Sequence, residues 1–134
     1  MKKVPISLII DDPAPVVSVY HAHCGSPVTR DGRPILASVP NTFLDTFCDV
    51  TERHGMKGKF SVVPMPANRG DIINGLSGVN QALVEEWIQT VQARLVPAFT
   101  IGPEMLTHHR AVDLSTGGCF DINEMEWADA LPFT

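Results

Sequence analysis

The amino-acid sequence predicts a mixed α/β fold in which parallel strands alternate with helices. Largely apolar runs of strand length occur at residues 4–10, 59–64 and 96–102, and a segment with helical periodicity separates each run from the next. Apolar runs without strict polar alternation are typical of strands that are buried on both faces of a parallel sheet. Their alternation with helices indicates βαβ units.

Length and composition are those of one folded domain. The chain has 134 residues, of which 44% are hydrophobic and 19% charged, and this balance excludes intrinsic disorder. A formal net charge of −5 argues against a nucleic-acid partner. No run approaches the ~20 apolar residues that span a membrane, and the N-terminal run is too short for a signal peptide, so we expect a cytoplasmic location. The three cysteines are widely spaced and form neither a disulfide framework nor a zinc ribbon.

The first strand is expected over Val4–Ile10, directly before Asp11 and Asp12. Residues 13–39 then form a long irregular segment with four prolines, in which Val16–Tyr20 has the composition of a short extended stretch. A loop of this length inside a compact domain is either functional or argues against the assignment of its neighbours.

The first helix is expected to begin at Asn41 or Thr42, since either side chain can cap the free N–H groups of a first turn. Gly55 follows its last residue, His54, and favours termination there. A histidine at this end needs no functional role, because a positive charge stabilises the carbonyl end of a helix. One face of the helix collects Phe43, Leu44, Phe47, Cys48 and Thr51.

A second strand at 59–64, a polar loop at 65–78 and a second helix form the next unit. Asn80 is expected to cap this helix, which extends to about Leu95 and is followed by the third strand at 96–102. The apolar stripe of the helix comprises Leu83, Val84, Trp87, Ile88, Val91 and Leu95.

Polar residues follow each of the three expected strands. Ligands of parallel α/β folds bind beyond the carboxyl ends of the strands, so Asp11–Asp12, the 65–78 loop and Thr107–His109 would share one edge of the sheet. Successive side chains of a strand point to opposite faces. Both aspartates can therefore serve one site, as metal ligand and as proton acceptor, only if the strand ends between them. The alternative is an ordinary turn opened by Asp12 and Pro13.

Histidines provide the nitrogen ligands that would complete such a site. His21 and His23 lie two residues apart, on one side of an extended segment, whereas the adjacent His108 and His109 are not expected to face the site together. Imidazole together with carboxylate suits zinc or another divalent transition metal. A histidine taken alone is more often an ordinary loop residue, so the metal hypothesis depends on several loops meeting at one sheet edge.

Arg69 and Asn74 are candidate contacts for a polar substrate, because both lie in the loop after the second strand. The phosphate-binding motifs G-x-G-x-x-G and G-x-x-x-x-G-K-[ST] do not occur in the sequence. The G-x-S-x-G motif of serine hydrolases is also absent. These absences argue against a nucleotide-phosphate cradle and against a serine nucleophile of that type.

Two motifs resemble a known family. Ile6–Asp12 is a strand that ends in a pair of aspartates, and histidines follow the third strand, as in the polysaccharide deacetylase superfamily of metal-dependent glycoside hydrolase and deacetylase (β/α) barrels. The resemblance covers about residues 4–115 and implies that Asp11 is the general base and Asp12 a metal ligand. The implied reaction removes an acetyl group from an N-acetylated carbohydrate, with a divalent metal, zinc foremost, as cofactor.

The histidine motif of that family has the form HxxxH, and its second histidine is absent here. His108 or His109 would supply one nitrogen ligand, and Asp113 stands four residues after His109. The ligands that the resemblance implies beside Asp12 are therefore drawn from His108, His109, Asp113, His21 and His23.

A complete (β/α) barrel has about 250 residues and at least about 200, which is more than this chain contains. We therefore expect residues 1–134 to be a single α/β domain that forms the first part of a barrel. The alternatives are a homo-oligomer, in which a second copy of the chain completes the fold, or a small open α/β sandwich. A capping box at 123–126 predicts a last short helix that ends at Leu131.

Two other functions fit parts of the pattern. A non-catalytic sugar-binding or metal-binding protein on the same scaffold would account for the incomplete histidine motif. A receiver-type signalling domain would account for the length and for the acidic end of the first strand. Its phosphoacceptor aspartate, however, would lie at the end of the third strand, and residues 96–102 contain no aspartate.

Overall fold

The computed structural model confirms the mixed α/β fold. It describes residues 4–18, 36–66, 69–104, 107, 111–112 and 114–120. At its centre is a parallel three-stranded sheet in the order β1–β4–β7, formed by Leu8–Asp11, Gly58–Val62 and Phe99–Pro103. The strands of this sheet therefore lie side by side in the order in which they occur in the chain.

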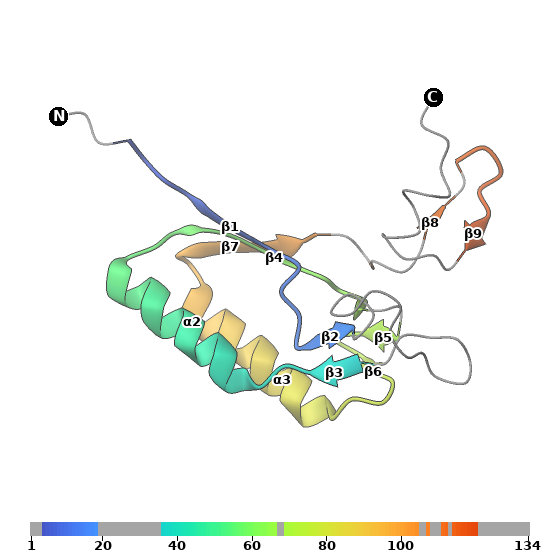
Figure 1. Ribbon diagram of the computed structural model, residues 1–134, viewed down its shortest axis with the longest axis horizontal. Helices are drawn as coiled ribbons and strands as arrows, with labels where there is room; N and C mark the ends of the chain where they lie inside the picture. Colours follow the sequence, from blue (N-terminus) through green and yellow to red (C-terminus); the bar gives the residue numbers. More distant parts are fainter. Residues whose placement is uncertain are drawn as a thin grey trace.

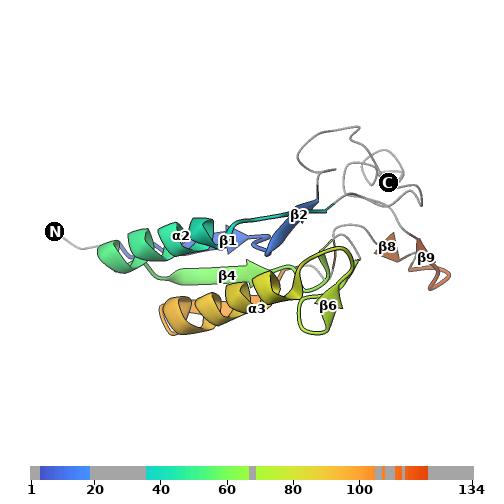
Figure 2. The same ribbon diagram turned by 90° about the horizontal axis from the view of Figure 1, so that it is seen from below.

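Two helices lie between these strands in the chain. Helix α2, Asn41–His54, precedes β4, and helix α3, Gln81–Thr90, continues into the π-helical turn η2, Val91–Leu95, before β7. Both helices pack side by side on the same face of the sheet, as Figure 1 and Figure 2 show from two directions. Among the described elements, no helix covers the opposite face.

The first strand begins later than expected and includes Asp11. Residues 4–7 are described but form no strand, and Ile6 is 91% exposed. Pairing explains this limit, because β4 begins at Gly58, the register partner of Leu8, and gives residues 4–7 no neighbour. A Cβ atom at Gly58 would collide with the Leu8 carbonyl oxygen, so this first pair of the ladder requires a glycine.

The two other strands are displaced by one to three residues from their predicted positions. Strand β4 covers Gly58–Val62 instead of 59–64. Strand β7 begins at Phe99 instead of Val96, because the helical segment before it continues to Leu95 and a turn follows.

Two of the three predicted capping positions are correct. Asn80 caps α3, since its Oδ1 accepts a hydrogen bond from the Ala82 N–H at 3.1 Å. Gly55 ends α2 in the left-handed conformation, with φ at 59°. The prediction that Asn41 or Thr42 caps α2 is wrong, because Pro40 occupies the cap position without a side-chain hydrogen bond. Asn41 Nδ2 instead donates to the Leu83 carbonyl at 3.3 Å and joins the first turns of the two helices.

The main hydrophobic core lies between the helices and the sheet. The predicted apolar faces supply it, as Leu44 and Cys48 from α2 and Trp87 from α3 are buried against Phe60. The Phe60 and Trp87 rings lie 6.0 Å apart between centroids, within the range of favourable aromatic pairs. Phe43 departs from the prediction, because its side chain is 72% exposed.

Small two-stranded antiparallel sheets occupy the segments that follow the carboxyl ends of the strands (Figure 1). The sequence predicted loops in these segments, except for a short extended stretch at Val16–Tyr20. Their strands are β2 (Val16–Ser18) with β3 (Leu36–Ser38), β5 (Gly70–Asp71) with β6 (Gly75–Leu76), and β8 (Ala111–Val112) with β9 (Cys119–Phe120).

Two further predictions concern other parts of the chain. The helix predicted at 123–131 lies outside the described residues. Within the described residues, no helix is both long enough and apolar enough to cross a membrane.

Candidate functional site

A row of three residues crosses the sheet at the carboxyl ends of its strands. Asp11 is the register partner of Ser61, and Ser61 is the register partner of Gly102. Side chains alternate along a strand, and the neighbouring Ile10 and Phe60 contact the core beneath the helices. The row Asp11–Ser61–Gly102 therefore belongs to the opposite face, which no described helix covers.

The backbone changes direction directly after this row. Strand β1 ends at Asp11, and Asp12 adopts the left-handed conformation with φ at 62°. Aspartate enters this region more readily than most residues, because its short polar side chain can form local hydrogen bonds. Both carboxylates are exposed. The strand thus ends between the two aspartates, which is the condition under which both can serve one site.

Ser61 is a polar residue of this row that sequence reasoning missed. Its side chain is completely buried, and its Oγ has no hydrogen-bond partner among the described residues. A buried hydroxyl without a partner costs about 1–3 kcal/mol. Because side chains alternate along a strand, the sequence could have indicated that Ser61 faces away from its neighbour Phe60. Only the pairing register of the strands, however, places Ser61 beside Asp11.

Lys59 adds a positive charge to the same face. It lies two residues before Ser61 in β4, between Ile9 and Thr100, and therefore on the same side of the sheet. Its Cε is 3.9 Å from the point that a Cβ atom on Gly102 would occupy, so the side chain extends toward the carboxyl-end row. Carboxylate, hydroxyl and ammonium groups are thereby brought to one end of one face.

The two predicted substrate contacts lie in the segment between β4 and α3. Asn74 holds a turn, because its Nδ2 donates to Asp71 Oδ1 at 3.1 Å and to Oδ2 at 2.9 Å. The backbone N–H groups of Asn74 and Ile73 also donate to Asp71 Oδ1, and these hydrogen bonds lower the pKa of Asp71. Arg69 is half-buried, and its carbonyl accepts a hydrogen bond from the Ser77 N–H at 2.7 Å.

The predicted ligands other than Asp12 lie outside the described residues: His21, His23, His108, His109 and Asp113. Thr107, which precedes the histidine pair, is described and is buried. Within the described part of the chain, no three His, Cys, Asp or Glu side chains gather closely enough to hold a metal ion. Cys48, on the predicted apolar face of α2, is a buried free thiol, and burial raises its pKa.

No family model matches the chain, and neither a curated protein nor a solved structure matches it. Its function has to be inferred from the residues at the carboxyl ends of β1, β4 and β7.

Proposed function

We propose that this chain carries part of the active site of a metal-dependent hydrolase that removes an acetyl group from an N-acetylated carbohydrate. One observation carries the proposal: Asp11 ends the first strand of a parallel sheet and Asp12 follows on the turn, while the strands lie in chain order and the helices cover one face. In (β/α) barrels, too, the strands follow one another in chain order and the helices cover one face of the sheet. The active sites of these barrels lie at the carboxyl ends of the strands.

The two aspartates take different roles in this proposal. Asp11 lies in the row with Ser61 and accepts the proton of the attacking water. Asp12 lies on the turn and offers its carboxylate to a divalent cation, zinc foremost, with further ligands beyond the described residues. Such an ion would polarise the substrate carbonyl and acidify the attacking water.

Lys59 has a supporting role on the same face. Its side chain extends toward the row that contains Asp11, and it is exposed to solvent. An ammonium group at this point would stabilise negative charge that develops on the carbonyl oxygen during attack.

The strand order argues against the receiver-type alternative. Folds of that doubly wound type place the first strand inside the sheet, in the order 2-1-3-4-5, with helices on both faces. Here β4 is the central strand, and among the described strands β1 pairs with β4 alone.

The test combines metal content with acetate release. The purified chain is expected to retain a divalent metal measured by plasma mass spectrometry, and Asp12→Ala to lose it. Glu85→Ala is the matched control, because Glu85 is an exposed acid on α3, far along the chain from the site. Acetate release from N-acetylglucosamine oligomers is expected to fall about 100-fold or more in Asp11→Asn.

Three outcomes separate the alternatives. A wild-type chain without metal above background would refute the proposal. Metal binding that depends on Asp12, without acetate release, would indicate the non-catalytic sugar-binding or metal-binding protein. Equal metal loss in Asp12→Ala and Glu85→Ala would show that the ion is bound nonspecifically.

A further inference from the structure

Residues 4–7, directly before β1, form an exposed arm. The arm continues the line of β1 beyond the start of β4, and Figure 1 shows it projecting from the sheet. Its side chains Val4 and Ile6 are 81% and 91% exposed. Side chains alternate along an extended chain, so Ile6 belongs to the same side as Leu8 and Ile10, which pack against the core beneath the helices. The arm therefore presents apolar surface on the helix-covered side of the sheet.

The outer edge of β1 offers backbone groups for pairing. The Leu8 N–H donates to the Lys57 carbonyl at 3.0 Å, on the side of β4. Backbone groups of successive strand residues point to opposite edges, so those of Ser7 and Ile9 point away from β4. Among the described strands, β1 pairs with β4 alone. A strand edge of this kind is a template for pairing with another chain.

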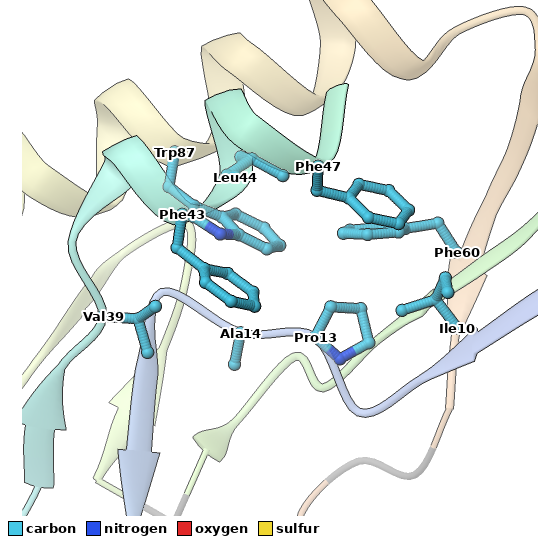
Figure 3. A pocket seen from close by; sticks show the side chains of 9 residues that line it. All are labelled: Ile10, Pro13, Ala14, Val39, Phe43, Leu44, Phe47, Phe60 and Trp87. Atoms are coloured by element: carbon cyan, nitrogen blue, oxygen red, sulfur yellow. The ribbon is translucent and has the colours of Figure 1, made fainter. Parts of the chain in front are cut away.

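An apolar cavity lies near the other end of β1, on the same side of the sheet as Ile6. Its volume is about 100 Å³, and Ile10 is among the nine residues that line it. Phe60 of β4 and Trp87 of α3, 2% and 4% exposed, form its inner wall, whereas Phe43 is 72% exposed. Figure 3 shows the Phe43 ring on α2 facing the chain that directly follows β1. Because β4 and α3 lie on the inner side of β1, the cavity opens to solvent beside the free edge of β1.

We propose that a second copy of this chain binds at this edge, with the two β1 strands paired antiparallel about a two-fold axis at Leu8. Ser7 of each copy then lies opposite the partner's Ile9, and the two residues exchange both of their backbone hydrogen bonds. Ile6 lies opposite the partner's Ile10, beside the opening of the partner's cavity. The arm and the cavity lie at opposite ends of one strand, so antiparallel pairing brings each arm to the cavity of the other copy. The contact is self-complementary, as a two-fold interface requires.

The register follows from the residues at the two ends of the paired segment. A shift of two residues in one direction would place Pro5, which has no N–H, opposite Ile9 and remove hydrogen bonds from the centre of the ladder. The same shift in the other direction would place Ile6 opposite Asp12 and bring a carboxylate against an apolar side chain. Pairing centred on Leu8 avoids both.

The first test measures association of the whole chain by sedimentation velocity over a range of concentrations. The wild type is expected to show a monomer–dimer equilibrium. Ile6→Lys is expected to weaken dimerisation about tenfold or more, because it places an ammonium group opposite the partner's Ile10. Ile73→Lys is the matched control, since Ile73 is 70% exposed in the turn between β5 and β6, and it is expected to leave dimerisation unchanged. Because Ile6 is exposed in the single chain, its substitution is expected to leave the fold intact.

The second test locates the two-fold axis by disulfide cross-linking. In the proposed pairing, the Cα atoms at position 8 of the two copies are about 4.5 Å apart, which is within the range of a disulfide. Leu8→Cys is therefore expected to form a covalent dimer on mild oxidation. Ser7→Cys is the matched control, because the two copies of position 7 are diagonal neighbours about 7–8 Å apart, and its cross-linking is expected to be slower by about tenfold or more. Both variants are made with Cys24 and Cys119 replaced by serine, whereas the buried Cys48 is kept.

Three results would overturn the inference. A wild-type chain that is monomeric at every concentration would show that no second copy binds. A dimer that tolerates Ile6→Lys as well as Ile73→Lys would place the interface elsewhere. Equal cross-linking of Leu8→Cys and Ser7→Cys would refute the axis at Leu8. These measurements use neither metal nor substrate, so their outcome is independent of the proposed hydrolase function.

Discussion

Asp12 controls the geometry of the candidate site at the scale of a single residue. Its left-handed backbone ends the alternation of β1, so that the strand no longer requires the two aspartates to point to opposite faces. A residue with a Cβ atom generally costs about 1–2 kcal/mol in this region, although aspartate recovers part of the cost through local hydrogen bonds. The same residue therefore has a backbone role and a proposed role as a metal ligand.

Substitution by glycine and by alanine separates these roles. Asp12→Gly and Asp12→Ala both remove the carboxylate, but only glycine adopts the positive φ of this position without strain. Asp12→Ala is expected to be less stable than Asp12→Gly by about 1 kcal/mol. Both variants are expected to lose the metal, so metal loss in a fully stable Asp12→Gly would assign the ligand role to the carboxylate.

Glu85 supplies the control for this comparison, because it lies in helix α3. There the order is expected to reverse, with Glu85→Gly less stable than Glu85→Ala by about 1 kcal/mol. Equal stability of Asp12→Gly and Asp12→Ala would contradict the left-handed conformation of Asp12.

At the scale of elements, Arg94 joins η2 to α2. Its guanidinium donates to Asp49 Oδ1 at 2.6 Å, to Glu52 Oε1 and Oε2 at 3.0 and 2.9 Å, and to Asp45 Oδ1 at 3.2 Å. The three acids lie on one face of α2, and the arginine lies in the π-helical turn that extends α3. Hydrogen bonds from Arg94 lower the pKa of Glu52.

The pH dependence of this contact follows from the direction of that shift. A carboxyl group with a lowered pKa in the folded state stabilises the protein above its unfolded pKa, about 4.3 for glutamate. This stability is lost as pH falls through the lower folded value. Arg94→Ala is therefore expected to lower Tm by a few degrees at pH 7, and the difference from the wild type is expected to shrink below about pH 4.

Lys57→Ala is the control for the loss of a positive charge, because Lys57 is exposed and lies outside this cluster. Its Tm is expected to equal that of the wild type at each pH. Because the acids are about half-exposed, salt is expected to reduce the effect of Arg94→Ala. A pH-independent difference in Tm would assign the effect to packing of the arginine side chain instead.

At the scale of the whole molecule, the sheet is covered on one face only. Among the described strands, β1 pairs with β4 alone, and its side chain Ile9 is 61% exposed on the open face. Open strand edges and exposed apolar sheet faces favour pairing with another chain. We therefore expect the 134-residue chain to self-associate.

Sedimentation velocity over a range of concentrations measures this association. Ile9→Lys is expected to shift the chain toward the monomer, because a charge on the open face opposes pairing. Leu114→Lys is the matched control, since Leu114 is 94% exposed but lies in a turn outside the sheet, and it is expected to leave association unchanged. A monomeric wild type at every concentration would show that the open face is stable in water.

Much of the fold could be predicted from local patterns. The apolar stripe that includes Val84, Trp87 and Leu95 is buried as its helical spacing predicts, and Asn80 and Gly55 end their helices through contacts within a few residues. The start of β1 could not be predicted in this way, because it depends on where Gly58 begins the neighbouring strand. The same applies to Asn41, whose bond to Leu83 replaces the expected cap.

Of the candidate site, only the pair of aspartates after the first strand could be predicted from the sequence. By itself the sequence determined that two aspartates follow an apolar strand and that helices alternate with strands, because periodicity and turn chemistry act over short distances. Only the tertiary structure decided the strand order, the row that joins Asp11 to Ser61, the reach of Lys59 and the cavity beside Trp87. The physical reason is that strand pairing and core packing join segments far apart in the chain, and local preferences do not specify which partners they meet.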